Sequence, residues 1–114
     1  MEIAAKSRDG HIVLTIVGEL DAYGAIDVDK VVSDALSGNN HNFLVDCMGM
    51  EYISSAGLGV FISHLDEIQS RKGEIVFYNM KEKVHHVFKL LGLDSVVKIV
   101  NDEDEALLAL GASE

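Results

Sequence analysis

The sequence predicts an α/β fold built on a mixed, mostly parallel sheet of about five strands with about four helices. Short β-branched runs alternate along the chain with longer segments in which apolar residues recur at every third or fourth position. Such an alternation favours parallel strands joined by helical crossovers that cover the sheet. The chain has 114 residues, of which 48% are hydrophobic, which is enough for one compact core. We therefore expect residues 1–114 to form a single domain.

The first third of the chain predicts a hairpin followed by a helix. Residues 1–7 and 11–17 are strand candidates, and the sequence RDG between them is typical of a tight turn. The second run, HIVLTIV, is nearly continuously apolar, as in a strand covered on both faces. Residues 22–37 predict a helix with Asp21 as its N-cap and a stop at Gly38. The apolar positions of this helix are Ile26, Val28, Val31, Val32, Ala35 and Leu36.

The remaining two thirds predict three more strands and three more helices. One helix is expected to begin near Ser55 and to end at Gly73, after a turn around Gly49. Its apolar positions are Leu58, Phe61, Ile62, Leu65 and Ile68. The other expected elements are strands at 43–47, 75–78 and 96–100 and helices at 81–91 and 103–110. The helix at 81–91 is expected to turn inward Val84, Val87, Phe88 and Leu91.

The charge balance of the chain is strongly acidic. Nineteen acidic residues against nine basic ones give a net charge of −10, so nucleic acid and anionic membranes would be repelled. The longest apolar stretch, residues 56–62, is far too short to span a membrane, and the first residues contain no apolar run of signal-peptide length. The single cysteine, Cys47, excludes an internal disulfide and suits a reducing compartment. These features predict a cytoplasmic protein with neither nucleic acid nor membrane as a partner.

The most informative segment is YISSAGLG at residues 52–59, where two hydroxyls precede two glycines at an expected strand-to-helix junction. Backbone N–H groups in the first turn of a helix lack intrahelical acceptors and carry the positive end of the helix dipole. A phosphate on Ser54 or Ser55 would therefore find hydrogen-bond donors there. Gly57 and Gly59 would let another protein's backbone approach closely. An ordinary serine N-cap with a glycine packing notch remains the alternative at this point.

Several segments in addition resemble those of one known family. YISSAGLGV at residues 52–60 resembles the phosphorylation motif of the STAS family, to which bacterial anti-sigma factor antagonists belong. GELD at 18–21 is similar to the family's motif at the end of the second strand. FLVD at 43–46 is similar to its third strand, and LLGL at 90–93 to the end of its third helix. From this resemblance, which extends over essentially the whole chain, the sequence is identified as a member of the family with a small STAS fold.

The resemblance implies a switch controlled by phosphorylation. In this family an unphosphorylated antagonist binds an anti-sigma factor that is also a serine kinase, and a sigma factor is thereby freed. Phosphorylation by the kinase releases the antagonist, and a PP2C-type phosphatase resets it. Alignment on the GLG sequence places the phosphoacceptor at Ser55, with Ser54, where the family often has aspartate, as the less favoured acceptor. The partner-binding residues implied are Asp21, Ser54, Ser55, Gly57, Leu58 and Gly59.

Asp21 belongs to the same expected site. It ends one parallel strand while Ser55 follows another, so both are expected along the carboxyl edge of the sheet. Capping of its own helix and contact with the partner, or orientation of Ser55, are about equally favoured roles for Asp21.

The sequence indicates no metal, no cofactor and no catalytic residue. The five histidines are scattered without a recognised metal-binding spacing, and His64 is expected on the polar side of its helix. Cys47 is expected to be a buried small hydrophobe. Because no long apolar helix face is left unassigned, a monomer is expected.

Two functions of other classes stay open. An enzyme with Ser55 as nucleophile would need a base, and the chain lacks the GxSxG elbow of serine hydrolases. A constitutive STAS adaptor of a transport or signalling assembly would share the fold but would never be phosphorylated at Ser55. A neighbouring gene for a kinase-fold anti-sigma factor would favour the switch, and genes for transporter subunits would favour the adaptor.

Overall fold

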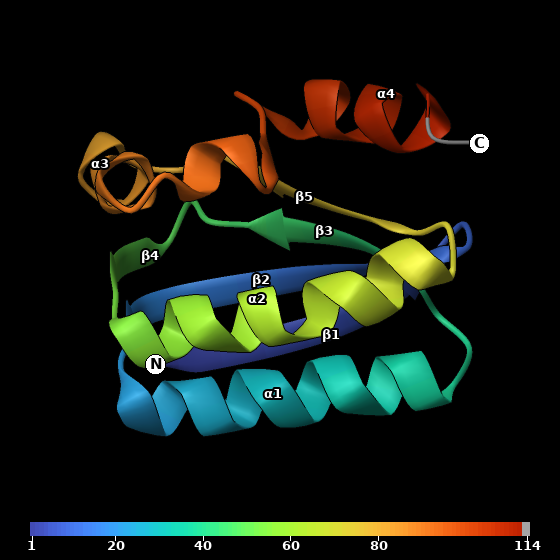
Figure 1. The fold of residues 1–114 in the computed structure, drawn as a ribbon, viewed down its shortest axis with the longest axis horizontal. Helices are drawn as coiled ribbons and strands as arrows, with labels where there is room; N and C mark the ends of the chain where they lie inside the picture. The colour runs from blue at the N-terminus through green and yellow to red at the C-terminus, as the bar shows by residue number, and fades with distance from the viewer. Residues whose placement is uncertain (113–114) are drawn as a thin grey trace.

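Helices pack on both faces of a central sheet in the computed structural model, which describes residues 1–112 (Figure 1). These residues form a six-stranded, mostly parallel mixed sheet and four α-helices, which confirms the expected α/β class. The elements in chain order are β1 (Glu2–Arg8), β2 (His11–Leu20), α1 (Ala22–Ser37), β3 (Asn42–Asp46), β4 (Met50–Ile53), α2 (Ser55–Ser70), β5 (Glu74–Tyr78), α3 (Glu82–Leu90), the short 3₁₀ helix η1 (Leu93–Ser95), β6 (Lys98–Ile99) and α4 (Glu103–Ala112).

The sheet has the order β1-β2-β3-β5-β6, and β4 pairs with β2 off this path. Strands β1 and β2 are antiparallel, and the other pairings are parallel. Their hairpin has positive φ at both Asp9 (51°) and Gly10 (86°), the combination that a two-residue type I′ turn requires. The expected hairpin is therefore confirmed.

Strand β2 is long enough to serve two neighbours in succession. Its first half pairs with β3, and its end pairs with β4 after an irregularity between Gly18 and Glu19. Gly18 has a φ of 99°, and its N–H donates to the carbonyl of Gly49 at 2.8 Å. A residue with a side chain would be strained in that conformation. The irregularity at Gly18 allows β4 to pair with the last residues of β2, so the two strands end beside each other.

Two apolar clusters hold the layers together. The larger one joins the sheet to α1, α2 and α3, and the smaller one joins the opposite face to α4. Strands β3 and β5 are buried on both faces, whereas Val17 near the end of β2 is exposed and Thr15 is half-buried. The prediction that residues 11–17 are covered on both faces is therefore wrong for the end of that run, because α4 covers only part of its face of the sheet.

The expected elements are found, with corrections to several boundaries and inward faces; α2 ends at Ser70 and not at Gly73, and β2 continues to Leu20. Strand β4 was not among the five expected strands, although residues 52–59 were expected at a strand-to-helix junction, and β6 contains only two of the five residues expected at 96–100. Ile26 is 68% exposed, Ile62 is 37% exposed and Leu91 is 58% exposed, although all three belong to the apolar positions expected to face inward. Leu91 follows the last residue of α3, and Gly92 ends that helix with a left-handed φ of 72°.

The described helices were also searched for membrane spans. Between residues 1 and 112, no helix combines the length and the apolar character that crossing a lipid bilayer would require.

Candidate functional site

The ends of two parallel strands place Asp21 and Ser54 beside each other at the carboxyl edge of the sheet. Leu20 pairs with Ile53 in the β2–β4 register. The N–H of Ser54 then donates to the carbonyl of Leu20 at 2.8 Å. Each strand is followed at once by a helix, so the N-termini of α1 and α2 open at the same edge. The expectation that Asp21 and the serine pair share the carboxyl edge is confirmed.

Ser54 is the N-cap of α2. Its backbone is extended (φ −87°, ψ 168°), and its hydroxyl accepts a hydrogen bond of 3.1 Å from the N–H of Gly57. Its carbonyl accepts the N–H of Leu58 at 3.0 Å, which begins the helical ladder. The half-buried Ser54 side chain is thus engaged in satisfying a first-turn donor that would otherwise have no partner.

Ser55 differs from Ser54 in both exposure and bonding. It is the first residue of α2 and is exposed. Within residues 1–112 its hydroxyl makes no hydrogen bond with the protein. Ser55 therefore presents a free hydroxyl directly beside backbone donors of the first helical turn.

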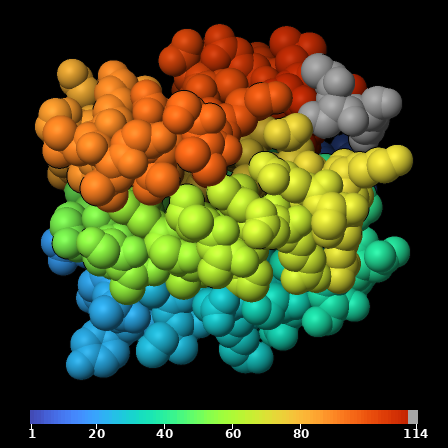
Figure 2. Space-filling view, in the orientation of Figure 1, coloured from blue at the N-terminus to red at the C-terminus, as the bar shows by residue number. Residues whose placement is uncertain are grey.

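The two glycines of the motif lie in opposite environments. A Cβ atom on Gly57 would lie 2.8 Å from Leu20 Cγ and 3.2 Å from Ile53 Cγ1, so Gly57 is a packing notch between α2 and the two strand ends. A Cβ atom on Gly59 would have no neighbour within 4 Å. Figure 2 shows α2 crossing one face of the molecule between α1 and the segment of α3 and η1. The exposed Gly59 lies one turn after Ser55 on this helix.

Leu58 requires a correction. It was expected among the partner-binding residues, but its side chain is only 4% exposed and belongs to the main core. The helical period decides this, because Leu58 lies on the same face of α2 as Phe61 and Leu65. Leu58 fixes α2 on the sheet and is not part of the surface at Ser55.

Asp21 caps α1 in the way that Ser54 caps α2. One carboxylate oxygen, Oδ1, accepts the N–H of Gly24 at 2.8 Å, and the Asp21 carbonyl accepts the N–H of Ala25 at 2.9 Å. The residue is exposed. The capping role is confirmed. A partner contact stays a prediction, and no hydrogen bond in the described part of the chain ties Asp21 to Ser55.

A group of charges near the serine pair was not anticipated from the sequence. Glu51 of β4 binds Lys81 and also Lys83, the latter at 2.9 Å. Hydrogen bonds from these two lysines lower the pKa of Glu51 to about 2. Because 30 and 32 residues separate the partners, no local pattern could have indicated the contact.

Two other candidate residues have structural roles. His64 was expected on the polar side of its helix, but its side chain is 14% exposed and its Nε2 lies 2.7 Å from Asp29 Oδ1 of α1. It therefore joins α1 to α2. Cys47 is buried as expected, and burial together with the charge of Asp46 raises the pKa of its thiol to about 12.

Across residues 1–112, no three histidine, cysteine, aspartate or glutamate side chains gather in a way that could hold a metal ion. The features of the site are its two helix caps, the free hydroxyl of Ser55 and the open position at Gly59.

Comparison with known proteins identifies the family of the chain. The model of the STAS domain matches residues 2–106. The chain belongs to the STAS family. The expected likeness to that family, on which the serine assignment depends, is thereby confirmed.

Two STAS relatives are similar to the chain over nearly its full length. An anti-sigma-B factor antagonist of Listeria monocytogenes is 29% identical over 106 residues, which are 92% of this chain and 93% of the relative. The crystal structure of a candidate anti-sigma factor antagonist from Thermotoga maritima is 30% identical, with a TM-score of 0.87. That likeness covers 96% of this chain and 94% of the other.

The STAS fold itself is also shared with a more distant protein, the anti-sigma factor antagonist SpoIIAA of Bacillus. Its unphosphorylated form matches with a TM-score of 0.75 at 15% identity, over 95% of this chain and 96% of SpoIIAA. Its phosphorylated form has the same TM-score at 16% identity, over 95% and 97%. Either form of SpoIIAA therefore has the fold described here.

Proposed function

We propose that this STAS protein is an anti-sigma factor antagonist that works by partner switching. With Ser55 unphosphorylated it binds an anti-sigma factor that has serine-kinase activity, and phosphorylation of Ser55 releases it. A PP2C-type phosphatase restores the binding form. The names of its relatives support the antagonist role. The main observation in support of the switch is the free, exposed hydroxyl of Ser55 at the first position of α2. The protein acts by binding and not by catalysis.

The different bonding of the two serines favours Ser55 over Ser54 as the acceptor. A kinase must bring its nucleotide phosphate onto the serine oxygen, which requires an accessible hydroxyl. Ser54 is half-buried, and modification of its oxygen would disturb the cap made with Gly57. Ser55 can be modified without loss of a hydrogen bond within the described residues.

A phosphate on Ser55 can be accepted by the fold without a large rearrangement. The first turn of α2 supplies N–H donors and the positive end of the helix dipole. The equal fold likeness to both forms of SpoIIAA supports the same view. The phosphate adds about −1.5 to −2 charges to a surface that a partner would otherwise cover and desolvate. Release therefore follows from charge and bulk at the interface.

The partner surface that we propose surrounds Ser55 with exposed residues of both helix starts. It contains the two capping residues, Asp21 and Ser54, and the open position Gly59. Gly57 lies underneath this surface and allows α2 to pack closely on the ends of β2 and β4. Two exposed aromatic side chains, Tyr23 and Tyr52, lie within two residues of these caps. Exposed tyrosines of this kind are common anchors in protein interfaces.

The decisive experiment is a capture from a lysate of the source cell with four baits. The baits are the wild type, Ser55→Ala, Ser55→Asp and Ser63→Asp. Ser63 is also exposed on α2, so that Ser63→Asp adds the same charge to the same helix away from the motif. We expect all baits except Ser55→Asp to retain an ATP-binding kinase-fold protein. Incubation with ATP should then phosphorylate the wild type and a Ser54→Ala variant but not Ser55→Ala.

Two results would overturn the assignment of the switch to Ser55. If all four baits retain the same proteins, Ser55 does not control binding and a constitutive STAS adaptor takes its place. If Ser54→Ala abolishes phosphorylation while Ser55→Ala keeps it, the acceptor is Ser54.

A further inference from the structure

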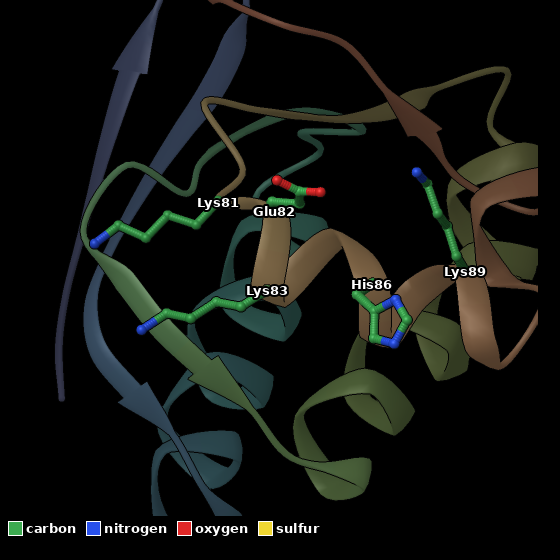
Figure 3. A pocket seen from close by; sticks show the side chains of 5 residues that line it. All are labelled: Lys81, Glu82, Lys83, His86 and Lys89. Carbon is green, nitrogen blue, oxygen red and sulfur yellow. The ribbon is translucent and has the colours of Figure 1, made fainter.

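The outer face of α3 concentrates positive charge on an acidic protein. Figure 3 shows the side chains that line an open hollow of about 660 Å³ on this face. We call these five residues the α3 face: Lys81, Glu82, Lys83, His86 and Lys89. Three of the nine basic residues of the chain thus fall within nine positions, although the net charge of the whole chain is −10.

The cations of this face are only partly neutralised by the protein. Lys81 and Lys83 share a single carboxylate, that of Glu51, and Glu82 is the one carboxylate within the face itself, so three lysines stand against two carboxylates. Lys89 is exposed and has no carboxylate partner among the described residues. His86 is exposed beside it and adds a further positive charge when protonated. The α3 face can therefore gain from an anion that the protein itself does not supply.

We propose that the α3 face is a docking surface for a carboxylate-rich segment of a partner protein. Charge complementarity selects this occupant, because a carboxylate ligand can pair with all the cations of the face in turn. On a chain that repels acidic molecules elsewhere, such a face would orient an approaching acidic partner. The inference does not require phosphorylation of Ser55 and is tested without it.

The spacing of the cations indicates an extended segment and not a single small anion. From Lys81 to Lys89 the chain advances by eight residues, which is about 12 Å along an α-helix. Figure 3 shows Lys81 and Lys83 extended toward β4, while His86 and Lys89 lie further along α3. One phosphate cannot reach both ends of this row, whereas successive glutamates of a peptide can.

The position of the α3 face connects it with the serine site. Helix α3 packs against β4, and β4 leads directly into Ser54 and Ser55. A partner that covers Ser55 can therefore extend over β4 onto this face. Docking of an acidic segment here would speed and strengthen encounters in a salt-dependent way, while Ser55 decides release.

The probe for the test is a fluorescein-labelled hexaglutamate peptide, titrated onto the full-length protein at low ionic strength. Binding is followed by fluorescence anisotropy, and its location by amide NMR shifts of the isotope-labelled protein. We expect saturable binding whose NMR shifts concentrate on residues 81–91 and Glu51. Added salt should weaken it. Lys83→Gln and Lys89→Gln should each reduce the affinity roughly threefold, the size of an exposed charge pair.

Two further variants make the test sharp. Glu51→Gln removes the carboxylate that holds Lys81 and Lys83 and should raise the affinity for the peptide. Lys30→Gln removes an exposed lysine of α1, which pairs with Asp34, and should leave the affinity unchanged. A loss in all lysine variants alike would show a general charge effect and would overturn the proposal.

Other outcomes identify other occupants and overturn the proposal in turn. The proposal fails if the peptide produces no shifts, or shifts spread evenly over the surface. If inorganic phosphate at equal concentration gives the same shifts, the face binds small anions. If sedimentation shows a dimer that Lys83→Gln dissociates, the occupant is an acidic surface of a second copy, such as residues 102–105.

Discussion

The backbone N–H of Gly57 donates a hydrogen bond of 3.1 Å to the hydroxyl of Ser54. This contact gives two adjacent serines different tasks, since Ser54 completes the first turn of α2 while Ser55 is left free and exposed. The structural serine and the proposed regulatory serine are therefore distinguishable by stability measurements alone.

Replacement of each serine by alanine should separate these tasks. Ser54→Ala removes a side-chain N-cap and should lower the free energy of unfolding by about 1 kcal/mol. Ser55→Ala breaks no hydrogen bond in the described residues and should change it by less than about 0.5 kcal/mol. Urea denaturation measures both values. Ser54→Asp keeps a capping oxygen and should recover most of the loss, and equal losses at the two positions would contradict the assignment.

The two glycines of the motif should respond to alanine with opposite signs. At Gly57 the new methyl group would lie 2.8 Å from Leu20 Cγ, so α2 must move away from the strand ends. We expect a loss of about 1–3 kcal/mol in the free energy of unfolding, as for other overpacked sites. At Gly59 the methyl group meets open space, and better helix propensity should stabilise the protein by up to about 1 kcal/mol. Thermal or urea denaturation measures both changes, and destabilisation by Gly59→Ala would contradict the open space around Gly59.

Local patterns were sufficient to predict the fold class and the Asp21 cap, and they left Ser54 and Ser55 as alternatives for a serine cap on the second helix. A cap depends on a side chain and an N–H three residues later, so Asp21 could be recognised within a few residues, whereas the hydrogen bond from Gly57 decides for Ser54 in the structure. Strand β4 was not predicted as a strand, because its four residues are buried, exposed, exposed and buried in turn and lack the alternation of an ordinary strand. Its pairing with β2 is what sets Ser54 beside Leu20, and no local pattern contains that information.

Contacts between distant residues account for the other differences. His64 looked solvent-facing because polar residues surround it on α2, yet Asp29 of the neighbouring helix makes its burial favourable. The contacts of Glu51 with Lys81 and Lys83 likewise join residues that are 30 and 32 positions apart in the sequence. Helical periodicity also led to the prediction that Ile26 faces inward. This prediction was wrong because only one face of α1 meets the sheet.

A change at Asp21 should distinguish capping from partner contact. Asp21→Asn retains an oxygen that can accept the N–H of Gly24, so the free energy of unfolding should stay close to that of the wild type. Capture of the partner should weaken, because the negative charge is lost from the proposed surface. Asp27→Asn, at another exposed carboxylate of α1, should alter neither property. Normal capture by Asp21→Asn would leave Asp21 with its capping role alone.

The thiol of Cys47 should be inert while the protein is folded. Burial is the main cause, together with the negative charge of Asp46, of a thiol pKa of about 12, so the reactive thiolate is scarce at mildly alkaline pH. A thiol reagent such as dithionitrobenzoate should label Cys47 slowly in buffer and promptly in denaturant. The labelling rate then reports opening of the core. Prompt labelling of the folded protein would contradict the buried position.

The ion pairs of Glu51 should give the protein a stability component that disappears in acid. Hydrogen bonds from Lys81 and Lys83 lower the pKa of Glu51 from its ordinary value of 4.5 to about 2. A lowered pKa means that folding favours the ionised form of the Glu51 carboxylate. The stabilisation is therefore complete above pH 4.5 and is lost as the pH falls toward 2.

Wild type and Glu51→Gln should therefore differ most near neutral pH and converge below the folded-state pKa. Chemical denaturation at a series of pH values measures the difference, and added salt should reduce it because the group is at the surface. Asp66→Asn removes the same charge from an exposed carboxylate of α2 without an ion pair in the described residues and is the matched control. A difference between wild type and Glu51→Gln that stays constant down to the lowest pH would mean that the glutamine acts through packing, and that the two lysines do not hold the Glu51 charge in solution.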